Sequence, residues 1–421
     1  MQLLKNEKVI DIMEKTLNHV DARLTDHGKR VAYLIYKILK PQRKFSDQQL
    51  RDICMLAMLH DVGAYKTEEI DKMVIFETID VWDHSIYGYL FLKYFSPLKE
   101  LAPVLLFHHA ECEEIMHLED PEHTILAQLI SLCDRADVFT LHGGDHDDFI
   151  KYINKNRNIK YRDDIADLFL TSDINIDTVF DDIDADKSFN NVFRKTPLTT
   201  DEVNGYVNMI IYSIDFRSSQ TVVHTIAATC IAEFLAKRLG ADEEEIKKVR
   251  TGAMLHDIGK VGIPTYILES ADGLSDSEMD IMKTHVDIAE KILEGNVDDD
   301  IKHIAVYHHE KLDGSGYPKQ LGIHDIGFFA RIVSVADIFS ALCGVRSYKG
   351  EYPKEEVIEI LGDMSAQNFI DPDIVSVAVE NFDEIIESVK MEAEPVIDVY
   401  NAINEEYLQF RSEMQNKIAI S

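Results

Sequence analysis

Cysteine is scarce in this sequence and follows no binding pattern. Only five of the 421 residues are cysteine, and no two of them stand at the CxxC spacing of zinc and redox motifs. An odd number of dispersed thiols argues against a disulfide framework and suits a reducing compartment. We therefore expect a cytoplasmic protein.

Long apolar runs are also missing. No stretch approaches the roughly 20 apolar residues that a membrane-spanning helix requires. The opening segment MQLLKNEKVIDIMEKTL is charged every few residues, which is unlike a signal peptide. We expect neither membrane insertion nor export.

Basic residues are few relative to acidic ones. The chain has 43 Lys and Arg against 76 Asp and Glu, which gives a formal net charge of −33. A field of this sign repels nucleic-acid backbones and anionic membranes, so we expect no long nucleic acid as a partner. A small anionic substrate requires local cations or metal ions that outweigh the overall charge.

Alternating β-branched runs typical of strands are scarce, whereas helix signals are frequent. Ser46 with Gln49 and Asp242 with Glu245 form capping-box patterns ahead of apolar-periodic segments, and Ser275 begins a third such helix. The sequence therefore predicts an all-α fold made of helical bundles.

The strongest pattern is an internal repeat with a period of about 200 residues. Five features recur in the same order: His27 with His224, His60–Asp61 with His256–Asp257, His84 with His285, His108–His109 with His308–His309, and Asp137 with Asp337. Accidental alignment of 17 histidines would rarely produce this register. We predict two tandem domains that arose by duplication, residues 1–195 and 200–421, separated by an acidic, irregular segment that ends at Pro197.

The C-terminal copy concentrates side chains that hold divalent metals. Neutral imidazoles donate nitrogen, and a carboxylate can bridge two ions. The set exceeds the needs of one ion and suits two: His224, His256, Asp257, His285, His308, His309 and Asp337. Burying these groups without metal would be costly. Paired ions with a bridging water are the usual machinery for hydrolysing phosphate esters.

Three segments carry a resemblance to a known family. LHDIGKVGIP, HHEKLDGSGYP and RIVSVADIFSAL closely resemble the motifs of the HD-GYP family, a branch of the HD metal-dependent phosphohydrolases, over roughly residues 205–390. The resemblance implies an all-helical domain with two or three iron or manganese ions that opens bacterial cyclic dinucleotides, chiefly cyclic di-GMP. It also implies that the seven residues above are the metal ligands, with Asp257 among the catalytic residues.

The resemblance further implies contacts with the substrate. Lys260 matches the lysine that contacts the scissile phosphate, where its ammonium would stabilise developing charge and help the leaving group. Arg346 and Lys349 match the cations that grip the substrate phosphates. Tyr317 is a candidate substrate contact, and Asp313 is a candidate hydrogen-bond partner for a ligating histidine.

Two local features refine this prediction. Gly314 and Gly316 permit positive φ and Pro318 fixes the exit, so DGSGYP is expected to form a tight turn beside the histidine pair. Some members of the family carry a glutamate four residues before the first histidine that helps to hold a third metal, and Gln220 stands there in this chain. We therefore expect two ions rather than three.

The N-terminal copy retains the metal ligands but not the phosphate contacts. Its candidate second metal site consists of His27, His60, Asp61, His84, His108, His109 and Asp137. Ala64 stands where the second copy has Lys260, the Gly-Tyr-Pro turn is absent, and His146 replaces Arg346. Three roles stay open for this half: a regulatory or structural metal-bound domain, a sensor of another small ligand, metal or gas, and an independent phosphoesterase.

We thus predict a two-domain phosphodiesterase that hydrolyses a cyclic dinucleotide to the linear dinucleotide and, as an open second step, to mononucleotides. Cyclic di-GMP is favoured and cyclic GMP–AMP is next, because nothing in the sequence selects the bases. Two alternatives remain: an HD-type hydrolase of linear nucleotides or (p)ppGpp, and a non-catalytic cyclic-dinucleotide receptor.

The tail is predicted to form an amphipathic helix, because apolar residues recur every three or four positions from Ile397 to Met414. Packing on its own chain is the preferred role of this helix. A homo-oligomer or a signalling partner, bound through the tail or the N-terminal domain, is left open.

Overall fold

The computed structural model describes residues 6–19, 26–64, 82–115, 118–217, 223–270, 273–344 and 352–418. Within these ranges the chain is helical, and apart from the isolated bridges Arg157–Tyr161 and Asp313–Gly322 it contains no strand. The predicted all-α fold is confirmed. None of the described helices combines the length and apolarity needed to cross a bilayer.

The chain divides into two compact units. Unit 1 consists mainly of Ile210–Ala402, and unit 2 consists of Val9–Met209 and Ile403–Ser421. The division falls inside helix α13 (Thr200–Asp215), whereas the predicted domains were 1–195 and 200–421. The predicted linker is also part of unit 2, because Phe189 and Phe193 of α12 (Lys187–Phe193) are fully buried there.

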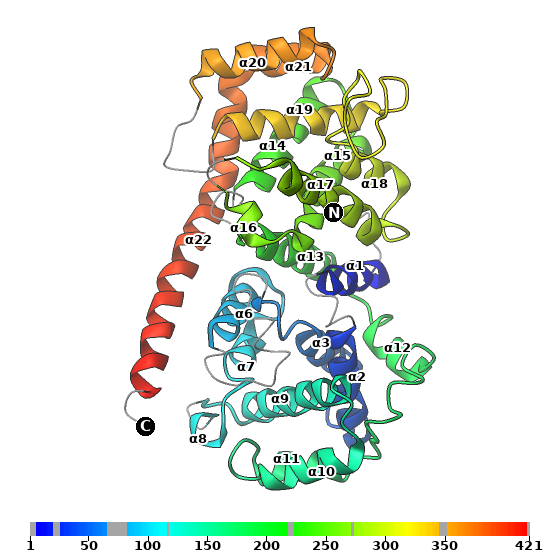
Figure 1. Cartoon of the computed structure of the whole chain (residues 1–421), viewed down its shortest axis with the longest axis vertical. Helices are drawn as coiled ribbons and strands as arrows, with labels where there is room; N and C mark the ends of the chain where they lie inside the picture. The colour runs from blue at the N-terminus through cyan, green and yellow to red at the C-terminus, as the bar shows by residue number, and fades with distance from the viewer. Residues whose placement is uncertain are drawn as a thin grey trace. The chain divides into compact units, whose positions relative to one another are not determined.

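Unit 1 contains the second copy of the histidine pattern. Its described elements are the last part of α13, α14 (His224–Arg238), α15 (Glu243–Leu255), the 3-10 helix η4 (Ile258–Gly262), α16 (Thr265–Leu268), α17 (Asp276–Leu293), α18 (Asp299–Val306), α19 (Phe328–Leu342), α20 (Lys354–Ala366), α21 (Pro372–Glu380) and the first part of α22 (Phe382–Ile418). Helix α14 packs on both α15 and α19 (Figure 1).

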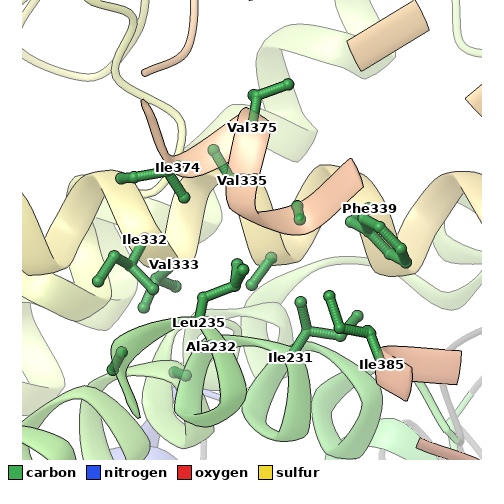
Figure 2. Packing of buried hydrophobic residues seen from close by; sticks show 14 of the residues in the cluster. Ile231, Ala232, Leu235, Ile332, Val333, Val335, Phe339, Ile374, Val375 and Ile385 are labelled. Atoms are coloured by element: carbon green, nitrogen blue, oxygen red, sulfur yellow. The ribbon is translucent and has the colours of Figure 1, made fainter. Parts of the chain in front are cut away.

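The core of unit 1 explains this packing. Ile231 and Leu235 are one helical turn apart on α14, and both are fully buried. They meet Ile332 and Phe339 of α19, with Ile374 of α21 closing the cluster (Figure 2). Burial of each such side chain contributes about 1.5–3 kcal/mol. The cluster therefore holds α14 and α19, which carry His224 and Asp337, against each other.

Unit 2 contains the first copy. Its described elements are α1 (Asn6–Asn18), α2 (His27–Leu39), η2 (Lys40–Gln42), α3 (Asp47–Met58), α6 (Trp82–Phe95), η3 (Lys99–Leu101), α7 (Ala102–Leu106), α8 (Cys112–Ile115), α9 (Pro121–Leu141), α10 (His146–Lys155), α11 (Asp163–Leu170), α12 and the first part of α13. Helix α2 packs on α3 and α9 (Figure 1), as α14 packs on α15 and α19 in unit 1. The duplication itself stays a prediction.

The three predicted helix starts are confirmed. Ser46, Asp242 and Ser275 are the N-caps of α3, α15 and α17, each in a capping box with the side chain three residues on. A cap of this kind stabilises a helix by about 1 kcal/mol. In all three cases the helix leads to, or contains, a histidine of the repeat.

The tail packs on its own chain, as predicted. The Tyr407 ring stacks on Tyr87 of α6 with 4.4 Å between ring centroids, and its hydroxyl donates to Asp83 at 2.9 Å. Glu406 accepts a hydrogen bond from Lys93 at 2.7 Å. These contacts explain why residues from Ile403 onward belong to unit 2, although the predicted domain 200–421 included them.

Candidate metal centre

Five segments of unit 1 bring the predicted ligands together. The ligands lie at the start of α14, the end of α15, the interior of α17, the end of α18 and the interior of α19: His224, His256 with Asp257, His285, His308 with His309, and Asp337. One group consists of His224, His256 and Asp257, the other of His285, His308 and His309; in each, the ligand atoms lie within 4.8 Å of one another. Most of these side chains are buried.

Asp257 lies between the two groups. Its Oδ2 is 3.4 Å from His224 Nε2 and 3.2 Å from His256 Nε2, whereas its Oδ1 is 3.6 Å from His285 Nε2. Asp337 has the same relation to the groups, with Oδ1 at 3.0 Å from His224 Nε2 and Oδ2 at 3.8 Å from His309 Nδ1. Each carboxylate therefore faces both groups, as a bridging ligand must.

The spacing of these atoms fits divalent ions. Ligand bonds of about 2.1 Å at angles between 90° and 109° place neighbouring donor atoms about 3.0–3.4 Å apart. The distances from Asp257 Oδ2 and Asp337 Oδ1 to His224 lie in this range. His256 Nε2 is buried and has no hydrogen-bond partner, which would be costly unless a cation bound it.

Hydrogen bonds select the tautomer of the histidines. Nδ1 of His256, His285 and His308 lies 2.6–2.7 Å from the carbonyl oxygen three residues earlier, so this nitrogen carries the proton and donates. Nε2 then keeps its lone pair for a metal. Ser340 Oγ donates to the Asp337 carbonyl and therefore accepts from His224 Nδ1 at 2.8 Å.

The charge state of the centre agrees with metal binding. Burial lowers the pKa of His309 to about 3. Burial and the neighbouring His309 also hold the pKa of His308 well below its usual value. Burial opposes the ionisation of Asp257, but protonated His256 and Lys260 hold its pKa well below the ordinary range. Against the effect of burial, Asp257 in turn raises the pKa of His256, whose second proton a bound cation would displace. Neutral imidazoles and ionised carboxylates are the protonation states in which both bind metal.

Glycine after the His-Asp pair allows the two groups to approach. A Cβ on Gly259 would lie 1.8 Å from the carbonyl oxygen of His285, so only glycine lets the turn after Asp257 rest on α17. Unit 2 repeats this contact, since a Cβ on Gly63 would lie 2.0 Å from the carbonyl oxygen of His84.

Lys260 lies at the centre, as predicted. Its Nζ is 2.5 Å from Asp257 Oδ2. The guanidinium of Arg217 donates to the carbonyl oxygens of Lys260 at 2.8 Å and Val261 at 2.7 Å and so holds this turn. Sequence reasoning missed Arg217, because its contacts are with backbone atoms and no motif spacing encodes them.

The DGSGYP turn lies beside the histidine pair. The Tyr317 ring lies against His309, with 4.7 Å between ring centroids, and the Tyr317 amide donates to the His309 carbonyl at 3.2 Å. Glu310 is buried and accepts hydrogen bonds from the amides of Lys319 and Leu321, at 2.7 and 2.9 Å, which closes the turn. Nothing in the sequence analysis had singled out Glu310.

The prediction for Asp313 is wrong. Its side chain is exposed and accepts hydrogen bonds from the amide and hydroxyl of Ser315, at 2.9 and 2.8 Å, so it caps the turn. The role expected of it, orienting a ligating histidine, belongs to Ser340. Arg346, Lys349 and Gln220 lie outside the described residues.

Asp215 is a further buried acid that sequence reasoning missed. Thr225, the neighbour of His224, donates its hydroxyl to Asp215 Oδ1 at 3.0 Å. Burial raises the pKa of the Asp215 carboxyl to about 8, against this hydrogen bond, and the charge of Asp257 adds to the rise. A single aspartate in an apolar helix carries no spacing signal that could have revealed it.

Unit 2 assembles six of its seven predicted residues in the same way, and the seventh requires a correction. His27 Nε2 lies 3.4 Å from Asp134 Oδ1, whereas Asp137 Oδ2 lies 2.7 Å from His27 Nδ1. Asp134 thus corresponds to Asp337, and Asp137 corresponds to Ser340. The alignment of Asp137 with Asp337 was displaced by three residues, which is nearly one helical turn.

Comparison with known proteins agrees with this geometry. Residues 208–374 match the family described as HD domain. The chain is 25% identical over 392 residues to 3'3'-cGAMP-specific phosphodiesterase 1 of Vibrio cholerae, which covers 87% of this chain and 89% of that protein.

Two other relatives match over shorter segments. The 3'3'-cGAMP-specific phosphodiesterase 2 of V. cholerae is 37% identical over 177 residues, 41% of this chain and 34% of that protein. A cyclic di-GMP phosphodiesterase of Thermotoga maritima is 33% identical over 194 residues, 45% of this chain and 52% of that protein. The chain thus spans about a third and about half of these two relatives.

The fold also has a solved counterpart. The crystal structure of a cyclic GMP-AMP specific phosphodiesterase of V. cholerae, V-cGAP3, matches with a TM-score of 0.56 over 90% of this chain and 98% of that chain, at 18% sequence identity. This likeness concerns the fold alone.

Proposed function

We propose that unit 1 is a metal-dependent phosphodiesterase that opens a cyclic dinucleotide by hydrolysing a 3'–5' phosphodiester. The observation that carries the proposal is the position of Asp257, whose two oxygens face different histidine groups while Lys260 Nζ lies 2.5 Å from one of them. The names of the relatives, all phosphodiesterases of cyclic dinucleotides, support it.

The residues of unit 1 have separate tasks in this proposal. Two divalent ions, iron or manganese, would activate a water molecule and neutralise phosphoryl charge when bound to the seven ligands. Lys260 contributes a fixed positive charge beside Asp257, where charge develops on the phosphate, and its ammonium can protonate the leaving oxygen. Tyr317 forms the wall over His309 and would contact the substrate there.

The substrate class is a cyclic dinucleotide, with cyclic GMP–AMP and cyclic di-GMP as the two candidates. The relative that matches over most of its length is named for the former, and the T. maritima relative for the latter. Both rings carry two phosphates, so Lys260 and the metal ions serve either one. We infer a cytoplasmic location from the five cysteines, all of which are free.

A substrate panel tests the proposal. Protein loaded with Mn²⁺ or, anaerobically, with Fe²⁺ is mixed with cyclic di-GMP, cyclic GMP–AMP, a linear dinucleotide and ppGpp, and products are separated by chromatography. We expect turnover of a cyclic dinucleotide that Asp257→Ala abolishes. Turnover of ppGpp alone would favour the linear-nucleotide hydrolase, and tight binding of a cyclic dinucleotide without turnover would favour the receptor.

A further inference from the structure

Unit 2 contains a second set of converging ligands that the activity proposed for unit 1 does not use. Ligand atoms of Asp61, His84, His108 and His109 lie within 4.8 Å of one another, and those of His27, His60 and Asp134 form another such group. Asp61 Oδ2 faces one group, at 3.1 Å from the Nε2 of His60, and its Oδ1 faces the other, at 4.0 Å from the Nε2 of His108. This is the arrangement of Asp257 in unit 1.

Several of these atoms are buried without a hydrogen-bond partner. They are both carboxylate oxygens of Asp61, Nε2 of His108 and Nε2 of His109. Burial of a carboxylate and two imidazole lone pairs in this state costs several kcal/mol unless a cation satisfies them. His60 and His108 donate Nδ1 to backbone carbonyls at 2.7 and 2.6 Å, so Nε2 is the nitrogen of each ring that faces the other ligands.

A charged pair supports the group of His27, His60 and Asp134 from outside. Arg30 donates two hydrogen bonds to Asp137, Nε to Oδ1 at 2.5 Å and Nη2 to Oδ2 at 2.9 Å, while Asp137 Oδ2 lies 2.7 Å from His27 Nδ1. A carboxylate in this position orients a ligating histidine and makes it a stronger donor to metal. Unit 1 has the neutral hydroxyl of Ser340 at the same place, and a carboxylate is a stronger hydrogen-bond acceptor than a hydroxyl.

We propose that unit 2 holds its own pair of divalent ions, one bound by His27, His60 and Asp134, the other by His84, His108 and His109, with Asp61 between them. Nitrogen and carboxylate donors without sulfur suit iron, manganese or zinc. Ala64 is buried where Lys260 stands in unit 1, so the ammonium of Lys260 has no equivalent at this position. It therefore binds metal without hydrolysing a cyclic phosphodiester.

Elemental analysis of the purified full chain tests this site without any substrate. We expect about four ions per wild-type chain, and about two after the double change Asp61→Ala with His108→Ala. The equivalent change in unit 1, Asp257→Ala with His308→Ala, should also leave about two, now all in unit 2. Because each variant keeps the other centre, the failure of one proposal is distinguishable from the failure of the other.

Two milder variants test the ligand assignment if the double variant fails to fold. Asp134→Asn should lose the ion beside His27, whereas Asp137→Asn should keep full metal content at saturation and bind that ion about 10–100-fold more weakly. The exposed Asp147→Asn is the matched control and should behave as wild type. Two outcomes would overturn the proposal. One is a wild-type protein that holds only two ions and keeps both after the double change Asp61→Ala with His108→Ala. The other is full metal retention by Asp134→Asn.

Discussion

Replacement of Lys260 by methionine separates the chemistry of unit 1 from its metal binding. Methionine retains most of the apolar stem and removes the charge. Lys260 Nζ lies 2.5 Å from Asp257 Oδ2, so the ammonium lies at the carboxylate that faces both histidine groups. Loss of one preorganised donor of this kind costs about 10²–10³-fold in turnover, about 2.7–4 kcal/mol in the transition state. We expect Lys260→Met to lose turnover by this factor.

The assay measures kcat and KM for the preferred cyclic dinucleotide together with metal content on the same preparation. Metal content should equal that of wild type, because Asp257 keeps its imidazole neighbours His224 and His256. Lys237→Met in the same unit is the matched control. Its ion pair with Glu233 is largely exposed on the lysine side, and such pairs contribute about 0–1 kcal/mol, so turnover should not change.

Two results would refute this reasoning. Wild-type turnover in Lys260→Met would show that the ammonium does not act on the phosphate. Loss of metal as severe as that of Asp257→Ala would show that Lys260 holds the centre together rather than taking part in the reaction.

Three further predictions concern the same unit. Gly259→Ala should destabilise the protein by about 3 kcal/mol or more in urea unfolding, because its Cβ would lie 1.8 Å from a carbonyl oxygen of α17. The control is Gly362→Ala on α20, where an added Cβ has no atom within 4 Å. This change should stabilise the protein by up to about 1 kcal/mol. Ser340→Ala should weaken metal binding about 10–100-fold in a chelator competition, because His224 Nδ1 loses its partner. The pKa of Asp215 is raised to about 8, so its folded form holds a proton that the unfolded chain releases near pH 4. Metal-free wild type should therefore lose stability as pH rises from about 4 to about 8, and Asp215→Asn should not; identical pH profiles would contradict this.

Much of the unit 1 site could be predicted because its ligands are tied to local signals. The His-Asp pair follows a capped helix, and the glycine two residues after Asp257 marks the close approach to α17. Helix ends place these side chains, and helix ends are what capping residues and breakers encode.

The errors arose where sequence spacing is degenerate. Asp134 and Asp137 lie three residues apart on one face of α9, so either could match Asp337 when only spacing is compared. The missing signal was that Asp337 and Ser340 are also three residues apart, as Asp134 and Asp137 are. Comparison of Asp134 with Asp337 and of Asp137 with Ser340, both 203 positions apart, would have selected the correct register.

The division between the units was missed for a different reason. A linker was expected because the segment before Pro197 is acidic and irregular, yet its aromatic residues Phe189 and Phe193 are buried in unit 2. Burial of a few aromatic side chains can anchor a segment whose average composition is polar. Local sequence patterns do not reveal this burial, because the contacting residues are far apart in the chain.

Comparison of the two units separates the residues proposed to bind metal from those proposed to hydrolyse the phosphodiester. Imidazoles with Nδ1 bonded to backbone carbonyls and a carboxylate facing two groups recur in both units, so we assign these features to the proposed metal binding. What unit 1 adds is an ammonium beside the bridging carboxylate and a glycine turn that brings Tyr317 over His309. A single Ala64→Lys change in unit 2 should therefore not create phosphodiesterase activity, because a cation there would face a centre that lacks the turn expected to contact the substrate. Activity acquired by that variant alone would assign the whole difference between the units to the ammonium.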